Sequence, residues 1–296
     1  MTQEQGSISS SAQVVVDLPC ETGEGPLWHE SSHTLCWVDI PAGTLYRFEP
    51  VTGMNGVIYQ HTGSIGGFTI QEDDSLVIFS DDGAIARFQE GEVETIIPGI
   101  EALGGSRFND VIADPEGRIF CGTMALDDGT AHLYRLDTDR SLHLIYDDLT
   151  QANGMGFSPD LSTMYLTDSN TFRIYRMRYD RTTGAVSDRE VLVQIPEGEG
   201  VPDGMAVDSD GTIWSARWGG GGIFHYSSDG KLLEKIDMPV DKVTSLAFGG
   251  ENLATAFVTT GGGQDRGPQN GELAGSLFQL DLGVTGRIPF RSRIGL

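Results

Sequence analysis

Lysine is nearly missing from this sequence. Lys231, Lys235 and Lys242 are the three lysines among 19 basic residues, which face 43 acidic residues and leave a formal net charge of −24. A surface of this sign repels nucleic acids and anionic membranes, so we expect neither as a partner. The acidic excess also favours a monomer, because like-charged surfaces repel one another.

Cysteine is equally sparse. Cys20, Cys36 and Cys121 are an odd number of thiols and include no Cys-x-x-Cys pair. This pattern argues against a disulfide framework and a zinc knuckle, and it favours buried thiols in a reducing compartment. We therefore expect a cytoplasmic protein. No apolar run approaches the ~18 residues of a membrane-spanning helix.

Long amphipathic helices and several catalytic motifs are missing as well. No segment keeps a helical hydrophobic period over three turns. The sequence has no Gly-x-Ser-x-Gly elbow and no glycine-rich phosphate loop, and its six histidines show no HExxH spacing. These absences argue against a serine hydrolase, a nucleotide-binding enzyme and a zinc protease of the HExxH type.

What the sequence has is glycine and repetition. Its 40 glycines indicate many turns, and short runs of alternating polarity recur between them. Each run is preceded by one similar run and followed by another after a brief turn. The central runs of the copies are 35–39, 76–80, 118–122, 163–167, 212–216 and 252–258.

Aligning these copies gives one column at the start of the first run. The column, with members 41 to 50 residues apart, reads Glu24, Gly66, Asn109, Asn153, Asp203 and Thr244. Units of three or four antiparallel strands at this spacing are propeller blades, so we predict an all-β, six-bladed β-propeller. We expect one domain over residues 12–296 after a flexible tail of residues 1–11. Residues 12–18 should pair with the last blade and close the ring.

The column predicts a metal site. Because the first strand of each blade lines the central channel, equivalent positions face one axis. Glu24, Asn109, Asn153 and Asp203 carry side-chain oxygens, which suit a hard divalent cation, and a cation would relieve repulsion between the two carboxylates. Calcium, zinc, manganese, magnesium and Fe(II) all remain candidates. The alternative is that each residue only occupies a turn, which Asn and Asp tolerate well.

Trp218 precedes four consecutive glycines. Its indole is a candidate substrate-binding wall at the channel mouth. The alternative is an aromatic side chain on the rim beside a wide turn.

Four motifs and three further segments carry a family resemblance. The motifs are Gly23-Glu24-Gly25-Pro26, Arg107-Phe108-Asn109-Asp110, Ala152-Asn153-Gly154-Met155 and Pro202-Asp203-Gly204-Met205, and the segments are 35–41, 122–124 and 239–245. With these residues the chain resembles the SMP-30/gluconolactonase/LRE family, which includes regucalcin and bacterial aldonolactonases. The resemblance runs from about residue 18 to the C-terminal end.

The resemblance implies a six-bladed propeller with one divalent metal ion held by Glu24, Asn153 and Asp203. It implies that Asp203 also transfers a proton and is the catalytic residue, and that Arg107 and Asn109 bind substrate. One position departs from the pattern. Several relatives carry a substrate-contacting glutamate where this chain has Asp127, so we expect Asp127 to contact substrate with a shorter reach.

We therefore expect a metal-dependent hydrolase that opens a small-molecule sugar lactone, such as glucono-, xylono- or arabinonolactone, to the aldonic acid. Two alternatives stay open. One is a calcium-binding, regucalcin-like protein without turnover. The other is a phosphotriesterase-like hydrolase that uses the same metal site.

Overall fold

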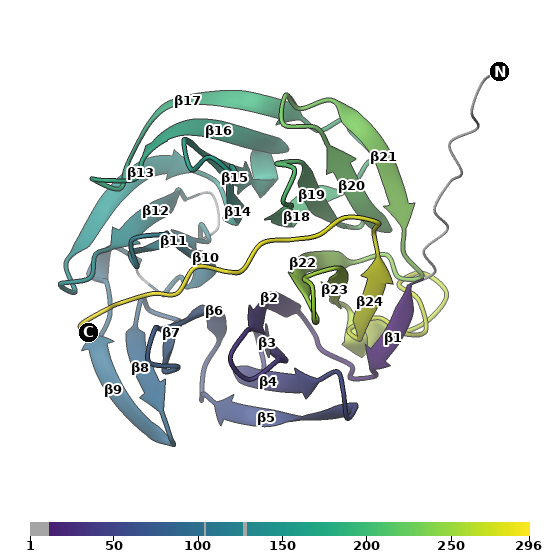
Figure 1. Cartoon of the computed structure of the whole chain (residues 1–296), viewed down its shortest axis with the longest axis horizontal. Coiled ribbons are helices and arrows are strands. Elements are labelled where there is room, and N and C mark those ends of the chain that lie inside the picture. Colours follow the sequence, from purple (N-terminus) through teal and green to yellow (C-terminus); the bar gives the residue numbers. More distant parts are fainter. Residues whose placement is uncertain (1–11, 104, 127–128) are drawn as a thin grey trace.

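The computed structural model describes residues 12–103, 105–126 and 129–296. Their strands form six antiparallel, four-stranded sheets arranged as blades around a central channel (Figure 1). The predicted six-bladed β-propeller is thereby confirmed. The tail expected over residues 1–11 lies outside the described residues.

The first five blades each take four consecutive strands, and the innermost strand comes first. The first blade contains β2 (Gly23–His29), β3 (Thr34–Asp39), β4 (Thr44–Glu49) and β5 (Met54–Gln60), and the second contains β6 (Ile65–Ile70), β7 (Leu76–Ser80), β8 (Ile85–Gln89) and β9 (Glu92–Ile97). The third contains β10 (Phe108–Ala113), β11 (Ile119–Thr123), β12 (Ala131–Leu136) and β13 (Leu142–Leu149), and the fourth contains β14 (Ala152–Phe157), β15 (Thr163–Asp168), β16 (Arg173–Asp180) and β17 (Ala185–Gln194). The fifth contains β18 (Val201–Val207), β19 (Ile213–Trp218), β20 (Gly222–Tyr226) and β21 (Leu232–Asp237). Short 3-10 turns lie in loops at Glu101–Leu103, Ser169–Thr171 and Gly263–Asp265.

The sixth blade joins the two ends of the chain. Its strands are β22 (Val243–Gly249), β23 (Thr255–Thr260), β24 (Leu277–Asp281) and, outermost, β1 (Gln13–Val16). Gln13 pairs with Gln279, which confirms that the N-terminal strand completes the last blade. The closure gives both strands a hydrogen-bonding partner that an open ring would leave missing.

Burial falls from the channel to the rim of each blade. Strand β7 is buried along its whole length, whereas most residues of the outer strand β9 are exposed. Apolar side chains pack between neighbouring blades as well as within each blade. At the junction of the last and first blades, for example, Trp28 and Phe257 stack with ring centroids 5.9 Å apart. Such contacts fix the angle between blades and hold the inner strands around the channel.

The C-terminal strap, residues 283–296, crosses one face of the ring (Figure 1). Its hydrogen bonds reach all six blades, at Ser31, Ile70, Gly117, Ser158, Ser209 and Leu253. Each of these partners lies in or beside the turn that joins the first and second strands of its blade. The strap therefore covers the face opposite to the one where the innermost strands begin.

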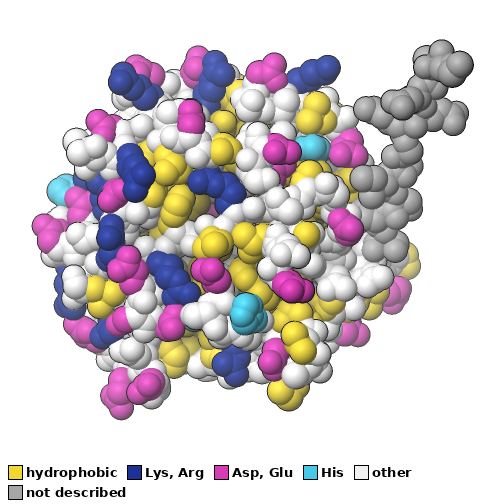
Figure 2. Space-filling model, viewed as in Figure 1, with side chains coloured by type: hydrophobic (Ala, Val, Ile, Leu, Met, Phe, Trp, Pro, Cys, Tyr) yellow, Lys and Arg dark blue, Asp and Glu magenta, His cyan; other side chains and the backbone are white. Residues whose placement is uncertain are grey.

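On the strap face, acidic and basic side chains alternate around exposed hydrophobic atoms (Figure 2). The strap supplies part of the basic charge, since Arg291 pairs with Asp74 and Arg293 with Glu72. None of the helices in the described residues is long and apolar enough to span a membrane.

Candidate active site

The six column residues all lie near the start of an innermost strand. In every blade the pairing between the first and second strands shifts next to this position. The shifts fall between Glu24 and Leu27, Ile65 and Gly67, Phe108 and Val111, Ala152 and Met155, Pro202 and Met205, and Val243 and Ser245. Bulges of this kind re-aim side chains, and they recur beside active sites.

The column residues of the fourth and fifth blades are in direct contact. The Asn153 amide donates one hydrogen bond to Oδ1 of Asp203 and another to Oγ of Ser169, at 3.1 Å. In the blade before, Asn109 donates to the backbone carbonyl of Ala152 at 2.9 Å. Three consecutive blades are thus linked through side chains of the column.

Glu24 reaches this group from the first blade. Its side chain is buried, and Oε2 accepts a hydrogen bond of 2.7 Å from the backbone of Gly25. Burial raises the pKa of Glu24 well above its usual range, and the nearby carboxylates of Asp203 and Asp110 raise it further. The first and fifth blades therefore bring two acidic side chains together.

Burial also raises the pKa of two other carboxyls in the channel, those of Asp203 and Asp110. Burial raises the pKa of Asp203 to about 7, although the hydrogen bond from Asn153 lowers it, and burial raises the pKa of Asp110 to about 6. The carboxylate of Asp110 raises the pKa of both Glu24 and Asp203, and a cation placed among such carboxylates would stabilise their charged forms.

Arg107 supplies positive charge beside the carboxylates. Its Nη1 donates to Oδ1 of Asn109 at 2.9 Å and to the carbonyl of Phe108 at 2.8 Å. Burial lowers the pKa of Arg107 to about 10, while Glu24 and Asp203 raise it, so the guanidinium stays charged at neutral pH. One guanidinium does not balance three carboxylates, and a divalent cation would complete the balance.

The side chains present therefore fit a hard cation. Glu24 and Asp203 provide carboxylate oxygens without a lysine in the column, and Asn153 would provide its amide oxygen after a rotation of the amide, whose nitrogen faces Asp203 in this structure. Among the described residues, no group of three or more His, Cys, Asp or Glu side chains is placed to hold a metal ion. The candidate centre predicted from the sequence has only two carboxylates, with an amide as its third member.

The glycines beside the column have two different functions. Gly25 has a φ of +55°, a conformation that other residues rarely adopt. Gly154 and Gly204 are needed for space, because a Cβ at Gly154 would lie 2.6 Å from the carbonyl oxygen of Asp203, and one at Gly204 would lie 2.1 Å from Oγ of Ser245. Both a positive φ and close backbone approach thus occur at the site.

The other two column positions do not add ligands. Gly66 has no side chain, and a Cβ there would lie 2.0 Å from the carbonyl oxygen of Phe108. Thr244 donates its hydroxyl to the carbonyl of Gly23 at 2.5 Å, which ties the last blade to the first. These two residues bring blades close together.

Trp218 lies at the end of β19, where it pairs with Val201, two residues before Asp203. The ammonium of Lys242 lies 4.9 Å from the centre of its indole ring. Trp218 is thus at the same end of the channel as the column, as a candidate wall requires. Asp127, the other expected substrate contact, lies outside the described residues.

Two residues beside the site were not singled out from the sequence. Asp110 follows Asn109 directly in the Arg-Phe-Asn-Asp motif, and this position could have identified it as a residue beside the site. Lys242 has the position in the sixth blade that Arg107 has in the third, two residues before the column. Comparing repeats at that position would have found it.

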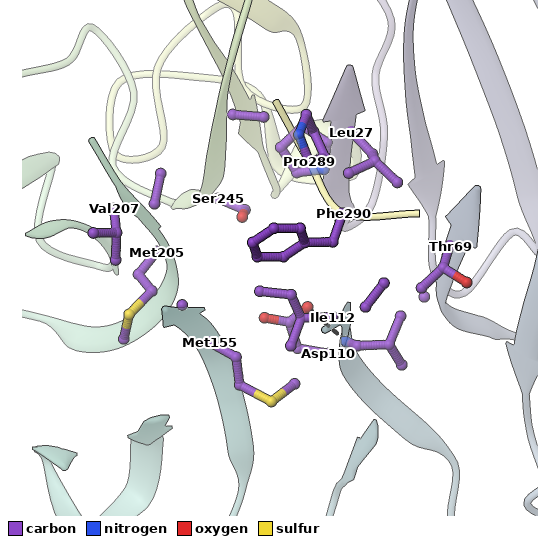
Figure 3. Close-up of a pocket in the computed structure, with 18 of the residues that line it drawn as sticks. Leu27, Thr69, Asp110, Ile112, Met155, Met205, Val207, Ser245, Pro289 and Phe290 are labelled. Carbon is purple, nitrogen blue, oxygen red and sulfur yellow. Dashed lines mark hydrogen bonds between the residues drawn. The ribbon is translucent and has the colours of Figure 1, made fainter. Parts of the chain in front are cut away.

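Below the column the channel contains a cavity of about 170 Å³. Met155, Met205 and Ile112 line it, Phe290 of the strap points into it, and Asp110 contributes carboxylate oxygens (Figure 3). Phe290 and Pro289 narrow the channel on the strap side. A polar substrate is therefore expected to enter from the opposite face, where the column lies.

Comparisons with known proteins agree with this architecture. The chain is 46% identical over 288 residues, 95% of this chain and 98% of the relative, to pentonolactonase XacC of Haloferax volcanii. Among solved structures it resembles a luciferin-regenerating enzyme, with a TM-score of 0.89 and 28% identity over 97% of this chain and 100% of the other. It also resembles a calcium-binding regucalcin of Agrobacterium tumefaciens, with a TM-score of 0.88 and 25% identity over 96% and 98% of the two chains.

The family model for the SMP-30/gluconolactonase/LRE-like region matches residues 22–262. This span begins beside Glu24 and includes every column position. The chain therefore belongs to the SMP-30/gluconolactonase/LRE-like family.

Proposed function

We propose that this protein hydrolyses a sugar lactone to the aldonic acid, with one divalent metal ion held by Glu24, Asn153 and Asp203. The observation that carries the proposal is the meeting of the buried carboxyls of Glu24 and Asp203, whose pKa values burial raises, with the amide of Asn153 at one end of the channel. The relative named pentonolactonase, 46% identical over nearly the whole length of both chains, supports an aldonolactone and, among glucono-, xylono- and arabinonolactone, favours the two five-carbon ones.

Each side chain has a role in this reaction. Asp203 accepts a proton from the attacking water as the water oxygen bonds to the lactone carbonyl carbon. Collapse of the tetrahedral adduct breaks the ring C–O bond, and the ring oxygen takes up a proton and becomes a hydroxyl. When bound, a divalent cation would polarise the carbonyl and stabilise the developing negative charge.

Arg107 and Asn109 would fix the sugar. A polyol is recognised by directed hydrogen bonds more than by apolar area. Nη1 of Arg107 already bonds to Asn109, so the two side chains form one donor-rich surface beside the carboxylates. Trp218 and Asp127 are proposed as further substrate contacts.

Acid release tests the proposal. A pH-indicator assay would present pentono- and hexonolactones to protein supplied in turn with magnesium, manganese, zinc, calcium and Fe(II). We expect acid release with at least one metal and none after chelation. Metal binding without acid release from any lactone would instead support a calcium-binding protein, and faster turnover of an organophosphate would support the phosphotriesterase alternative.

A further inference from the structure

Lys242 and Arg107 occupy equivalent positions in two blades. Each stands two residues before the column, and each backbone carbonyl accepts a hydrogen bond from the residue that follows the second strand of its blade. Met124 donates to Arg107 at 3.1 Å, and Gly261 donates to Lys242 at 3.0 Å. The two residues therefore start their blades at the same level of the channel.

The third and sixth blades stand opposite each other. With six blades in chain order around the ring, β10 and β22 face one another across the channel (Figure 1). The mouth thus has a basic residue on each of two opposite sides, Arg107 on one and Lys242 on the other. Arg107 donates a hydrogen bond to the column residue of its own blade, Asn109. The column residue of the sixth blade, Thr244, bonds to the backbone carbonyl of Gly23 instead of to Lys242.

The Lys242 side chain is held in place by its surroundings. Its ammonium lies over the indole of Trp218, and its Cδ would lie 3.1 Å from a Cβ at Gly262. A Cβ at Gly261 would lie 2.7 Å from the far edge of the same indole. Glycines thus make room for both side chains, which remain partly exposed at the mouth.

Lys242 also lacks a carboxylate partner in the part of the chain that the structure describes. None of the ion pairs among those residues includes it, whereas Lys235 pairs with Asp237 at 2.9 Å. Lys231 and Arg107 also have no carboxylate partner among the described residues, so the feature that distinguishes Lys242 is its place over the Trp218 indole at the channel mouth. An ammonium resting on an aromatic ring keeps its donors available to an incoming anion.

We propose that Lys242, positioned by Trp218, binds an anionic group at the end of the sugar distant from the lactone carbonyl. This inference rests on the proposed function, which places the carbonyl at Glu24, Asn153 and Asp203 and leaves the rest of the sugar towards the mouth. It extends the substrate class from neutral aldonolactones to lactones with a terminal acidic group, and Lys242 becomes a specificity-determining residue.

The test compares two lactones that differ at one carbon. Glucono-1,4-lactone ends in a hydroxymethyl group and glucaro-1,4-lactone in a carboxylate. In the metal-loaded enzyme, Lys242→Met should lower the ratio of kcat/KM for glucarolactone to that for gluconolactone by about 10-fold, because a hydrogen bond to a charged group is lost. Lys242→Arg should keep most of the preference. Lys235→Met is the matched control and should leave the ratio unchanged.

A binding measurement separates failure of this inference from failure of the proposed function. Trp28, Trp37 and Trp214 are 4%, 2% and 1% exposed, so fluorescence changes on ligand binding should come mainly from Trp218. Glucarate should perturb this emission at lower concentration than gluconate, and Lys242→Met should abolish the difference. An unchanged kinetic ratio, or equal responses to the two acids in the unsubstituted protein, would overturn the inference even if lactones are hydrolysed. If no lactone is hydrolysed, the fluorescence result alone decides.

Discussion

The side-chain amide of Asn153 donates a hydrogen bond to Oδ1 of Asp203, although the two residues belong to different blades and are 50 positions apart. The contact exists because each residue stands at a bulge near the start of an innermost strand. Glu24 stands at the corresponding bulge in the first blade. This shared geometry underlies the proposed metal centre.

Asp203→Asn should weaken binding of a divalent cation by more than about 10-fold and abolish lactone hydrolysis, because one carboxylate and the proton acceptor are both lost. Calorimetric titration with Mn²⁺ and the acid-release assay measure the two effects. Asp208→Asn is the matched control. Asp208 is a buried aspartate just after the far end of β18 that bonds to Trp214, so its loss should lower stability and leave metal affinity unchanged. Equal metal affinity in Asp203→Asn and the unsubstituted protein would contradict the assignment.

Arg107→Met should lower kcat/KM for a lactone by about 10–100-fold through loss of charged hydrogen bonds to the substrate. The metal should still bind, since Arg107 is not among the proposed ligands. Arg176→Met removes an exposed arginine that pairs with Glu190 on an outer part of the fourth blade and should have no kinetic effect. Full activity of Arg107→Met would remove Arg107 from the substrate site.

Ile294→Ala should destabilise the protein by about 2–5 kcal/mol, because the side chain is 0% exposed and its loss leaves a cavity. Ile288 lies on the same strap but is 50% exposed, so Ile288→Ala should change stability by less than about 1 kcal/mol. Chemical denaturation of both variants measures the difference. Similar losses of stability in the two variants would show that burial of the Ile294 side chain does not stabilise the protein.

The three thiols should resist modification in the folded protein. Burial raises the pKa of Cys20 and of Cys36 to about 12 and that of Cys121 further still, so the reactive thiolate is scarce until the pH passes these values. A thiol reagent at about pH 8 should react slowly with the native chain and rapidly with all three cysteines after unfolding. Fast reaction in the native state would indicate that a cysteine is accessible.

Added salt should stabilise the protein. The formal net charge of −24 produces long-range repulsion that salt screens. Salt also weakens surface pairs such as Arg291 with Asp74, but each such pair contributes only about 0–1 kcal/mol. We expect the melting temperature to rise between about 0.1 M and about 2 M KCl. A fall over this range would show that the ion pairs outweigh the repulsion.

The sequence was sufficient to predict the ring and its closure. Strand-sized runs repeat along the chain, and the run at residues 12–18 has no partner within its own copy. It was therefore expected to pair with the last blade, and Gln13 pairs there with Gln279. The aligned column likewise anticipated that Asn153 and Asp203 would meet, because equivalent positions in a ring share one axis.

Non-repeating features could not be predicted in this way. The strap bonds to a different turn in each blade, and no periodicity relates Arg287 or Phe290 to those partners. The contact between Trp218 and Lys242 joins side chains of adjacent blades, and its geometry depends on the space left at Gly261. Such contacts follow from the assembled surface rather than from a local pattern.

The most direct measurement is an anomalous difference map from crystals soaked in Mn²⁺. We predict one strong peak within ligand distance of oxygen atoms from Glu24, Asn153 and Asp203, with the Asn153 amide oxygen turned towards it. A map with no peak among these side chains at saturating metal, or with its strongest peak elsewhere, would contradict the proposed centre.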